Sequence, residues 1–155
     1  MRLYLVQHGE AKPESEDPAR PLTEQGRQEA ERVARFVVQR GVRVVRIVHS
    51  GKLRARQTAE AWSQLLPDAR VEEQEGLDPN DDPARWADRL REVTEDLLLL
   101  VGHLPHLRRL ADLLLCGDPE RQLVTFRMAG VVCLEREDPT GRWSVRWVLP
   151  PELVP

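Results

Sequence analysis

Two histidines and one arginine stand at matching places along this sequence, and such a set of side chains can act on an anion. His8 lies two residues after the apolar run Leu3–Val6, and His103 lies two residues after another run that ends at Val101. Arg54 comes shortly after a β-branched run between them. If these runs are parallel strands of one sheet, their carboxyl ends lie along one edge, where open α/β sheets bind ligands. The spacing therefore predicts that the two imidazoles and the guanidinium converge.

Two imidazoles beside a guanidinium fit a phosphoryl-transfer site. An arginine clamps phosphoryl oxygens, one neutral histidine attacks, and a second histidine hydrogen-bonds the group in transfer. A structural alternative stays open, in which each of the three caps a strand end or bonds a backbone carbonyl. A zinc alternative would use His8, His103 and His106, but no carboxylate or cysteine is obviously placed with them, so we expect no metal.

Several common catalytic motifs are missing from the sequence. It has no G-x-S-x-G nucleophile elbow, no glycine-rich loop ending in Lys-Ser or Lys-Thr, and no G-x-G-x-x-G. The two cysteines, Cys116 and Cys133, form no C-x-x-C pair, and both lie in apolar segments. We expect both to be buried, as small apolar side chains in a reducing cytoplasm.

Alternating strand and helix patterns surround these residues and must position them. Apolar runs predict strands near residues 3–6, 44–48, 70–74 and 96–101, and amphipathic patterns predict helices near 23–40, 53–66, 84–93 and from 105 onward. Two further strands, 130–135 and 143–149, flank the turn sequence Asp138-Pro139-Thr140-Gly141, which indicates an antiparallel hairpin. This order predicts an α/β fold, a three-layer α/β/α sandwich with a mostly parallel sheet and an antiparallel C-terminal hairpin.

Length and composition fit one domain over residues 1–155, since a typical domain has about 150 residues. Apolar residues make up 41% of the chain, and the net charge of −3 argues against a dedicated nucleic-acid binder. The longest aliphatic run, Leu97–Val101, is far shorter than the ~20 residues that cross a bilayer. Because the N-terminal apolar run is too short for a signal peptide, we expect a cytoplasmic protein without a membrane partner.

Four ordered motifs resemble the signatures of the histidine phosphatase superfamily. The family's Arg-His-Gly opening, L-T-x-x-G element, S-P-x-x-R-A-x-Q-T-A segment and V-G-H-x-P element correspond in order to Leu5–Ala11, Pro21–Gly26, Ser50–Ala59 and Val101–Pro105. Their order and spacing run from residue 5 to residue 107. The short chain and its Trp143–Pro150 tail most closely resemble the small bacterial SixA-type phosphohistidine phosphatases.

The resemblance implies a phosphatase that works through a phospho-enzyme. His8 would be the nucleophile, Arg54 would clamp the phosphoryl oxygens, and His103 would hydrogen-bond the same group. Family members of this kind need no metal or organic cofactor. The implied partner is a phosphorylated protein or a small phosphate ester, and the oligomeric state is not indicated.

The sequence departs from the family pattern at Gln7, where the family has arginine before the nucleophile. Gln7 would still bind phosphate together with His8, Arg54 and His103, but without a charge. A charge-assisted hydrogen bond exceeds a neutral one by about 1–3 kcal/mol at the transition state, which corresponds to about 5- to 150-fold in rate. We expect Arg56 to lie at the surface or just behind the site, with a contact to the phosphate as the alternative, and it is the neighbouring cation most able to compensate. A second departure, Gly51 in place of the usual proline, is expected only to alter loop stiffness.

The general acid is not singled out by the sequence. The family takes it from a region that corresponds here to about residues 72–82, where the candidates are Glu75, Asp78, Asp81 and Asp82. Three functions stay open: a phosphatase acting on phosphohistidine in a protein, a small-molecule phosphomonoesterase, and a phosphoryl-binding module weakened in catalysis by Gln7. Phosphohistidine needs a general acid least, because imidazole leaves more easily than an alkoxide.

We expect the remaining polar residues to have structural rather than catalytic roles. His49 is expected to be structural, and Glu10 either orients His8 or fixes its loop. A solvated face of the fourth helix is expected to carry His106, Arg108 and Arg109.

Overall fold

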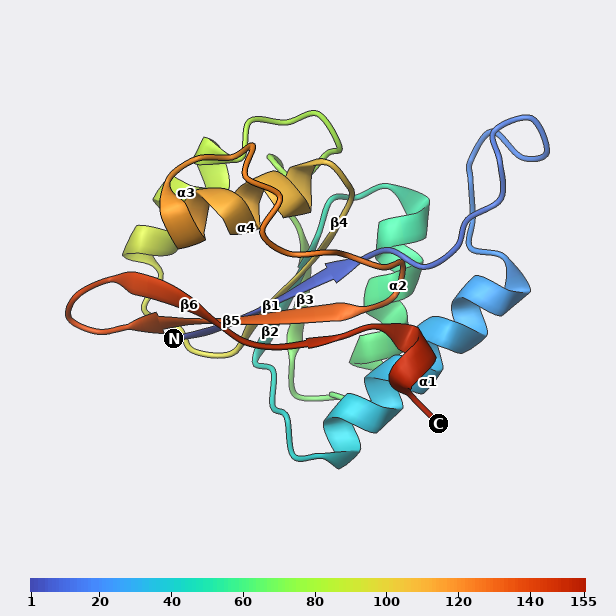
Figure 1. The fold of residues 1–155 in the computed structure, drawn as a ribbon. Helices are drawn as coiled ribbons and strands as arrows, with labels where there is room; N and C mark the ends of the chain where they lie inside the picture. Colours follow the sequence, from blue (N-terminus) through green and yellow to red (C-terminus); the bar gives the residue numbers. More distant parts are fainter.

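The computed structural model describes all 155 residues of the chain and contains one six-stranded sheet with helices on both faces (Figure 1). In chain order the elements are β1 (Arg2–Gln7), α1 (Glu24–Gln39), β2 (Arg46–His49), α2 (Leu53–Ser63), β3 (Arg70–Glu73), α3 (Ala84–Glu92), β4 (Leu98–Gly102), α4 (His106–Cys116), β5 (Val131–Glu137), β6 (Arg142–Leu149) and the short 3-10 turn η1 (Pro151–Leu153).

The strand order brings the ends of the parallel strands level. The order is β3-β2-β4-β1-β5-β6, in which the first four are parallel and the last two form the antiparallel hairpin. Gln7 of β1 pairs with Gly102 of β4, and His49 of β2 pairs with Val101 of the same strand. The residues that follow these three strands therefore leave the sheet at one edge.

Two apolar layers, one on each face of the sheet, hold the sandwich together. Along β1 the side chains alternate, so that Leu3 and Leu5 join the cluster under α3 and α4, whereas Tyr4 and Val6 join the cluster under α1 and α2. Figure 1 shows α3 and α4 above the sheet and α1 below it. The predicted three-layer, mostly parallel fold with its C-terminal hairpin is confirmed.

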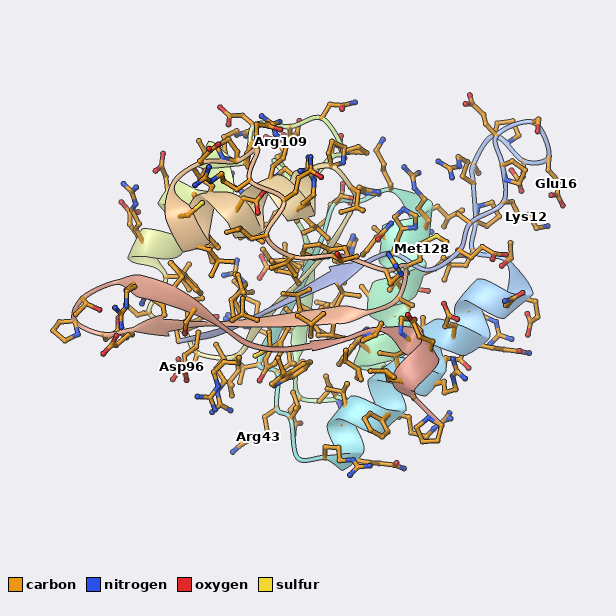
Figure 2. All side chains as sticks on the ribbon, in the orientation of Figure 1. Lys12, Glu16, Arg43, Asp96, Arg109 and Met128 are labelled. Atoms are coloured by element: carbon orange, nitrogen blue, oxygen red, sulfur yellow. The ribbon has the colours of Figure 1, made fainter.

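The loop from residue 11 to residue 22 projects from the body beyond the carboxyl end of β1, and Figure 2 labels Lys12 and Glu16 on it. Its two arms are held together by a bridge between Ala11 and Leu22 and by a 2.8 Å hydrogen bond from the Lys12 amide to the Pro21 carbonyl. Thr23 then caps α1, because its hydroxyl oxygen accepts a 2.9 Å hydrogen bond from the Gly26 amide.

Two sequence-based expectations about local structure are wrong. The second helix ends at Ser63 rather than near 66, because Leu65 and Leu66 continue only in hydrogen-bonded turns before Pro67. Cys133 is buried, but Cys116 is exposed. Cys116 is the last residue of α4, and the left-handed Gly117 (φ +78°) ends the helix there, so the thiol lies outside the apolar layer.

Candidate active site

The structure brings the two predicted histidines together at the carboxyl edge of the sheet. The ring centroids of His8 and His103 lie 5.1 Å apart, and both side chains are buried. Arg54 lies in the first turn of α2 and is close enough that its positive charge helps to lower the pKa of both histidines. The predicted convergence of His8, Arg54 and His103 is therefore present in the fold.

His8 is held in one tautomer by its own loop. Its backbone amide donates to the Gly102 carbonyl at 3.0 Å, which continues the β1–β4 pairing by one residue. Its Nδ1 lies 2.7 Å from the Gly9 carbonyl oxygen, which can only accept, so Nδ1 carries the proton. Burial, with smaller contributions from Arg54 and Arg20, lowers the pKa of His8 to about 4. At neutral pH the ring is uncharged and Nε2 keeps its lone pair.

Thr58 connects the His8 loop to the helix that carries Arg54. The Gly9 amide donates to the Thr58 hydroxyl oxygen at 3.0 Å, and the same hydroxyl donates to the Arg54 carbonyl at 2.8 Å. Thr58 is fully buried. Gly9 also approaches the α1 backbone closely, since a Cβ at Gly9 would lie 2.9 Å from the Gly26 carbonyl oxygen. Sequence reasoning did not assign Thr58 a positioning role, although it belongs to the quoted Q-T-A motif.

Arg54 has no carboxylate within ion-pair distance, and its buried Nε has no hydrogen-bond partner. Burial lowers the pKa of Arg54, the charge of Arg20 lowers it further, and Asp78 acts in the opposite direction. A guanidinium that is partly buried and unpaired retains its full capacity to bind an anion.

His103 is positioned by Ser50, which follows β2. The Ser50 hydroxyl and His103 Nε2 share a hydrogen bond of 2.7 Å, while the buried Nδ1 has no partner. Burial, followed by His8 and Arg54, lowers the pKa of His103 to about 3. Sequence reasoning missed this contact, and its only signal was the serine that opens the S-x-x-x-R-A motif.

Gln7 lies at the end of β1, half-buried, and its buried Oε1 has no hydrogen-bond partner. Arg56, expected to compensate for the missing arginine, lies on the exposed side of α2 and forms an ion pair with Glu60 at 3.7 Å. The positive charges that act on His8 are those of Arg54 and Arg20. The surface position expected for Arg56 is confirmed, whereas the compensating role considered for it finds no support, because its side chain points to solvent and pairs with Glu60.

The structure separates the four candidate acids. Asp78 lines a cavity of about 520 Å³ that also contains Ser50, and its charge acts on Arg54. Asp81 accepts a 2.9 Å hydrogen bond from the Asp78 amide, and Asp82 accepts one of 2.9 Å from the Ala84 amide at the start of α3. The Glu75 side chain is 89% exposed and pairs with Arg85. Of the four candidates, Asp78 is the one whose charge acts on Arg54 of the proposed phosphoryl site.

Gly51 does more than alter loop stiffness. Its φ of +91° lies in the left-handed region, whereas proline is fixed near about −65°, so the usual proline cannot adopt this backbone. The Glu73 side chain occupies the space where a Cβ at Gly51 would stand. The Gly51 amide donates to His49 Nδ1 at 3.1 Å, which supports the structural role expected for His49.

The expected solvated face of α4 is only partly present. His106 is fully buried, and neither ring nitrogen has a partner. Burial lowers its pKa to about 4, opposed by the charges of the 78–82 loop. Arg108 and Arg109 are partly buried and both pair with Glu120. The expectation for His106 is wrong, because His106 lies on the buried face of α4 together with Leu107 and Leu110.

Glu10 fixes the loop after β1, since its carboxylate accepts a 2.9 Å hydrogen bond from the Thr23 hydroxyl. No group of three or more histidine, cysteine, aspartate or glutamate side chains is placed to hold a metal ion. None of the helices has both the length and the apolar character needed to cross a membrane.

Comparisons with known proteins agree with the geometry. The model of the histidine phosphatase superfamily (branch 1) matches residues 3–80. An uncharacterised protein of Picosynechococcus sp. is 34% identical over 142 residues, which cover 86% of this chain and 84% of that protein. Phosphohistidine phosphatase SixA of Escherichia coli K12 is 27% identical over 150 residues, 94% of this chain and 93% of the relative.

Solved structures give the same result. The protein histidine phosphatase SixA complexed with tungstate superimposes with a TM-score of 0.88 at 25% identity, with all of both chains covered. A SixA-like protein from Agrobacterium tumefaciens gives 0.79 at 27% identity over 97% of each chain. The chain therefore belongs to the histidine phosphatase superfamily, in its SixA-type branch, and is a phosphatase.

Proposed function

We propose that this phosphatase removes the phosphoryl group from phosphohistidine in a protein, through a covalent phosphohistidine at His8. The observation that carries the proposal is the state of His8. It is a neutral imidazole with its proton fixed on Nδ1, 5.1 Å from His103. An unpaired guanidinium, Arg54, lies beside it. A nucleophile next to a preformed anion clamp is the arrangement that phosphoryl transfer requires.

The reaction proceeds in two displacements at phosphorus. His8 Nε2 attacks, a new P–N bond forms, and the substrate's P–N bond breaks with its electron pair on the departing imidazole, which takes up a proton. Water then attacks phosphorus, the bond to His8 breaks, and its electron pair returns to Nε2 as inorganic phosphate leaves. Arg54 and His103 bind the phosphoryl oxygens in both steps, and the amide N–H of Gln7 supplies a neutral donor.

Asp78 is the carboxylate that we assign to the leaving-group side. It lies in the cavity that reaches Ser50, and it acts on Arg54. This observation favours a second candidate function, the hydrolysis of a small phosphomonoester, because an alkoxide leaves only when it is protonated. Phosphohistidine requires such a proton less, since imidazole is the better leaving group.

The charge of the same cavity supports a protein substrate over a small anionic one. Its lining contains four carboxylates and one guanidinium, at Glu73, Glu75, Asp78, Asp81 and Arg85, and no hydrophobic residue. A small substrate with a second anionic group beside its phosphate would be repelled there. We infer that residues 1–155 act as one catalytic domain in the cytoplasm on a phosphorylated protein, without nucleic acid or membrane.

A substrate panel tests the proposal. A phosphohistidine peptide, an aryl phosphate and a sugar phosphate are compared by kcat/KM, and rapid quench of the parent enzyme traps the acid-labile phospho-enzyme. We expect the phosphohistidine peptide to be the best substrate. A sugar phosphate that is turned over faster would establish the phosphomonoesterase instead, and binding of all three without turnover would establish the phosphoryl-binding module.

Asp78→Asn separates the two chemistries, with Glu75→Gln as the matched exposed control. We expect kcat/KM for an alkyl phosphate to fall by about 100-fold or more, the usual contribution of a general acid, and that for the phosphohistidine peptide to change much less. Equal losses on both substrates would show that Asp78 does not act as the acid.

A further inference from the structure

The turn that follows β2 contains a hydrogen bond between His49 and Gly51 that proline at position 51 would exclude. The Gly51 amide donates to His49 Nδ1 at 3.1 Å. Proline has no N–H to donate. His49 is the last residue of β2, and it is buried with 5% of its surface exposed. In this chain a buried side chain therefore holds the turn in which the family usually has a proline ring.

Ser50 lies between the two bonded residues, and its hydroxyl contacts two further groups. The Lys52 amide donates to Ser50 Oγ at 3.3 Å. The same Oγ lies 2.7 Å from His103 Nε2. The Lys52 contact uses an acceptor position of the hydroxyl and leaves its proton free for His103. Because the His49–Gly51 bond brackets Ser50, the backbone of this turn sets the position of the hydroxyl.

The second ring nitrogen of His103 has no partner within the fold. Nε2 is occupied by Ser50, whereas the buried Nδ1 is free. Nδ1 is therefore the ring nitrogen through which His103 can bind a phosphoryl oxygen, and it binds one only as an N–H donor. Burial lowers the pKa of His103 to about 3, so at neutral pH the ring carries a single proton. With that proton on Nδ1, Nε2 must accept the hydrogen bond from the Ser50 hydroxyl.

We propose that His49 is a positioning residue for the phosphatase reaction, and that it acts through Ser50 on His103. By accepting the Gly51 amide, His49 fixes the turn that carries the Ser50 hydroxyl. The hydroxyl then donates to Nε2, and His103 keeps its proton on Nδ1 for the phosphoryl oxygens. Without the His49 bond the turn is released, and His103 also adopts the tautomer that presents a lone pair to those oxygens. The proposal rests on the proposed function, because it takes His103 as a phosphoryl ligand.

NMR of the parent enzyme tests the hydrogen-bond directions without requiring turnover. Histidine labelled with the NMR-active nitrogen isotope distinguishes protonated from unprotonated ring nitrogens, and His103→Asn assigns the His103 signals by their loss. At neutral pH we expect the proton on Nδ1 in His103 and on Nε2 in His49, whose Nδ1 accepts from Gly51. A parent with the His103 proton on Nε2, or with the His49 proton on Nδ1, would overturn the proposal.

Two substitutions at His49 separate the hydrogen bond from the bulk of the ring. His49→Leu keeps an apolar side chain but has no acceptor, and we expect kcat/KM for an aryl phosphate to fall by about 10- to 100-fold, as for a small displacement of a catalytic group. Both tautomers of His103 should then be present. His49→Asn keeps an acceptor for the amide two residues further on, so it should stay within about threefold of the parent.

Substitutions at Ser50 test the second step of the same path. Ser50→Ala removes the donor to Nε2 and should give the mixture of His103 tautomers and the loss of kcat/KM expected of His49→Leu. Ser50→Thr retains the hydroxyl and should keep the Nδ1–H tautomer. Ser50→Ala with the parent's tautomer and kcat/KM would contradict the proposal.

His106→Leu is the matched control, since it removes another buried imidazole, one without a hydrogen-bond partner. It should change neither kcat/KM nor the tautomer of His103, and thermal melting checks that each variant is folded. Folded His49→Leu with the parent's kcat/KM and tautomer would overturn the role of His49. Equal losses in His49→Leu and His49→Asn would also overturn it, because the acceptor would then be irrelevant.

The two proposals can fail separately. If His49→Leu shifts the His103 tautomer and lowers turnover of the aryl phosphate, but no phosphohistidine peptide is a substrate, the proposed substrate is wrong and the role of His49 stands. If the parent turns over phosphohistidine and carries the His103 proton on Nε2, the function stands and the positioning proposal is wrong.

Discussion

The arginines of the β5–β6 hairpin and those at the carboxyl edge of the parallel strands have opposite surroundings. In the hairpin each arginine has a carboxylate: Arg136 pairs with Asp138 at 3.2 Å, Arg142 with Glu137 at 3.4 Å, and Arg146 with Glu135 at 3.0 Å. At the sheet edge, Arg54 and Arg20 have none. The hairpin also contains no buried side-chain nitrogen or oxygen without a partner, whereas Gln7, Arg54 and His103 each contain one.

This difference separates the hairpin, whose arginines are paired within the fold, from the proposed anion site, whose buried polar groups have no partner. A surface arginine that is paired with a carboxylate contributes little to stability, and its hydrogen-bonding groups already have a partner. A buried donor without a partner costs stability until a ligand occupies it. The sheet edge is therefore expected to bind anions at some cost in stability, and the hairpin is expected to tolerate substitution without loss of activity.

The largest effect is expected at His8. His8→Ala removes the nucleophile, and turnover should fall more than about 1,000-fold, as for other nucleophiles of covalent catalysis. The fold should persist, because His8 packs at the edge of the sheet rather than within either apolar layer. Steady-state kinetics and thermal melting give the two readouts. Activity of the folded variant within tenfold of the parent would contradict the mechanism.

A paired substitution of arginines tests the comparison directly. Arg54→Ala should lower kcat/KM by about 100- to 1,000-fold, the usual effect of removing a preorganised donor, while melting temperature stays level or rises. Arg146→Ala, in the hairpin, should leave kcat/KM unchanged and reduce stability by less than about 1 kcal/mol. Equal loss of activity in both variants would remove the distinction between the two regions.

Adding a cation to the sheet edge should have a smaller effect. Gln7→Arg places a forked donor next to His8 and should raise kcat/KM or tighten phosphate binding by about tenfold. The assay is kcat/KM on an aryl phosphate and on a phosphohistidine peptide. If Gln7→Arg lowers both values in a folded protein, then Gln7 is adapted to this site.

The smallest effect concerns stability in acid and comes from His106. Its pKa is about 4 in the fold and near 6.5 when unfolded, so below pH 6.5 the unfolded chain binds a proton that the folded one does not. Its contribution to stability is therefore lost as pH falls from about 6.5 to about 4.

His106→Leu removes this proton uptake. Between pH 7.5 and pH 5 the parent should lose about 2 kcal/mol more than the variant, or about 4 to 8 °C in melting temperature. His8 and His103 titrate in both proteins, so their contributions cancel in the difference in stability between the parent and the variant. Parallel melting curves across this range would show that His106 is not buried as a neutral ring.

The sequence predicted the parts of the site that regular structure positions. His8 and His103 follow neighbouring parallel strands, and Arg54 begins the helix after a third, so the periodicity of the strands was enough to bring them to one edge. Their chemical assignment as nucleophile and phosphate ligands stays a prediction. The hairpin itself was likewise predicted by the turn that joins its strands, but its ion pairs were not.

Residues placed by loops could not be predicted in this way. Arg20 is held where its loop folds back on Lys12, and no periodicity encodes that contact. Ser50 and Thr58 act through single hydrogen bonds to His103 and Gly9, whose distances depend on the whole packing. His106 was predicted on the solvated side of α4, although it lies four residues before the buried Leu110 and so on the same helix face.

The left-handed backbone at Gly51 prevents a simple replacement of this glycine by the proline that is usual in the family. The substitution Gly51→Pro would require φ at residue 51 to change sign. That rotation would displace the turn in which the Ser50 hydroxyl is hydrogen-bonded to His103. The Glu73 side chain also occupies the space that a side chain at position 51 would need. Consensus-guided engineering that restores proline at position 51 should therefore fail as a single step, and succeed only with coordinated changes at residues 50–52 and 73.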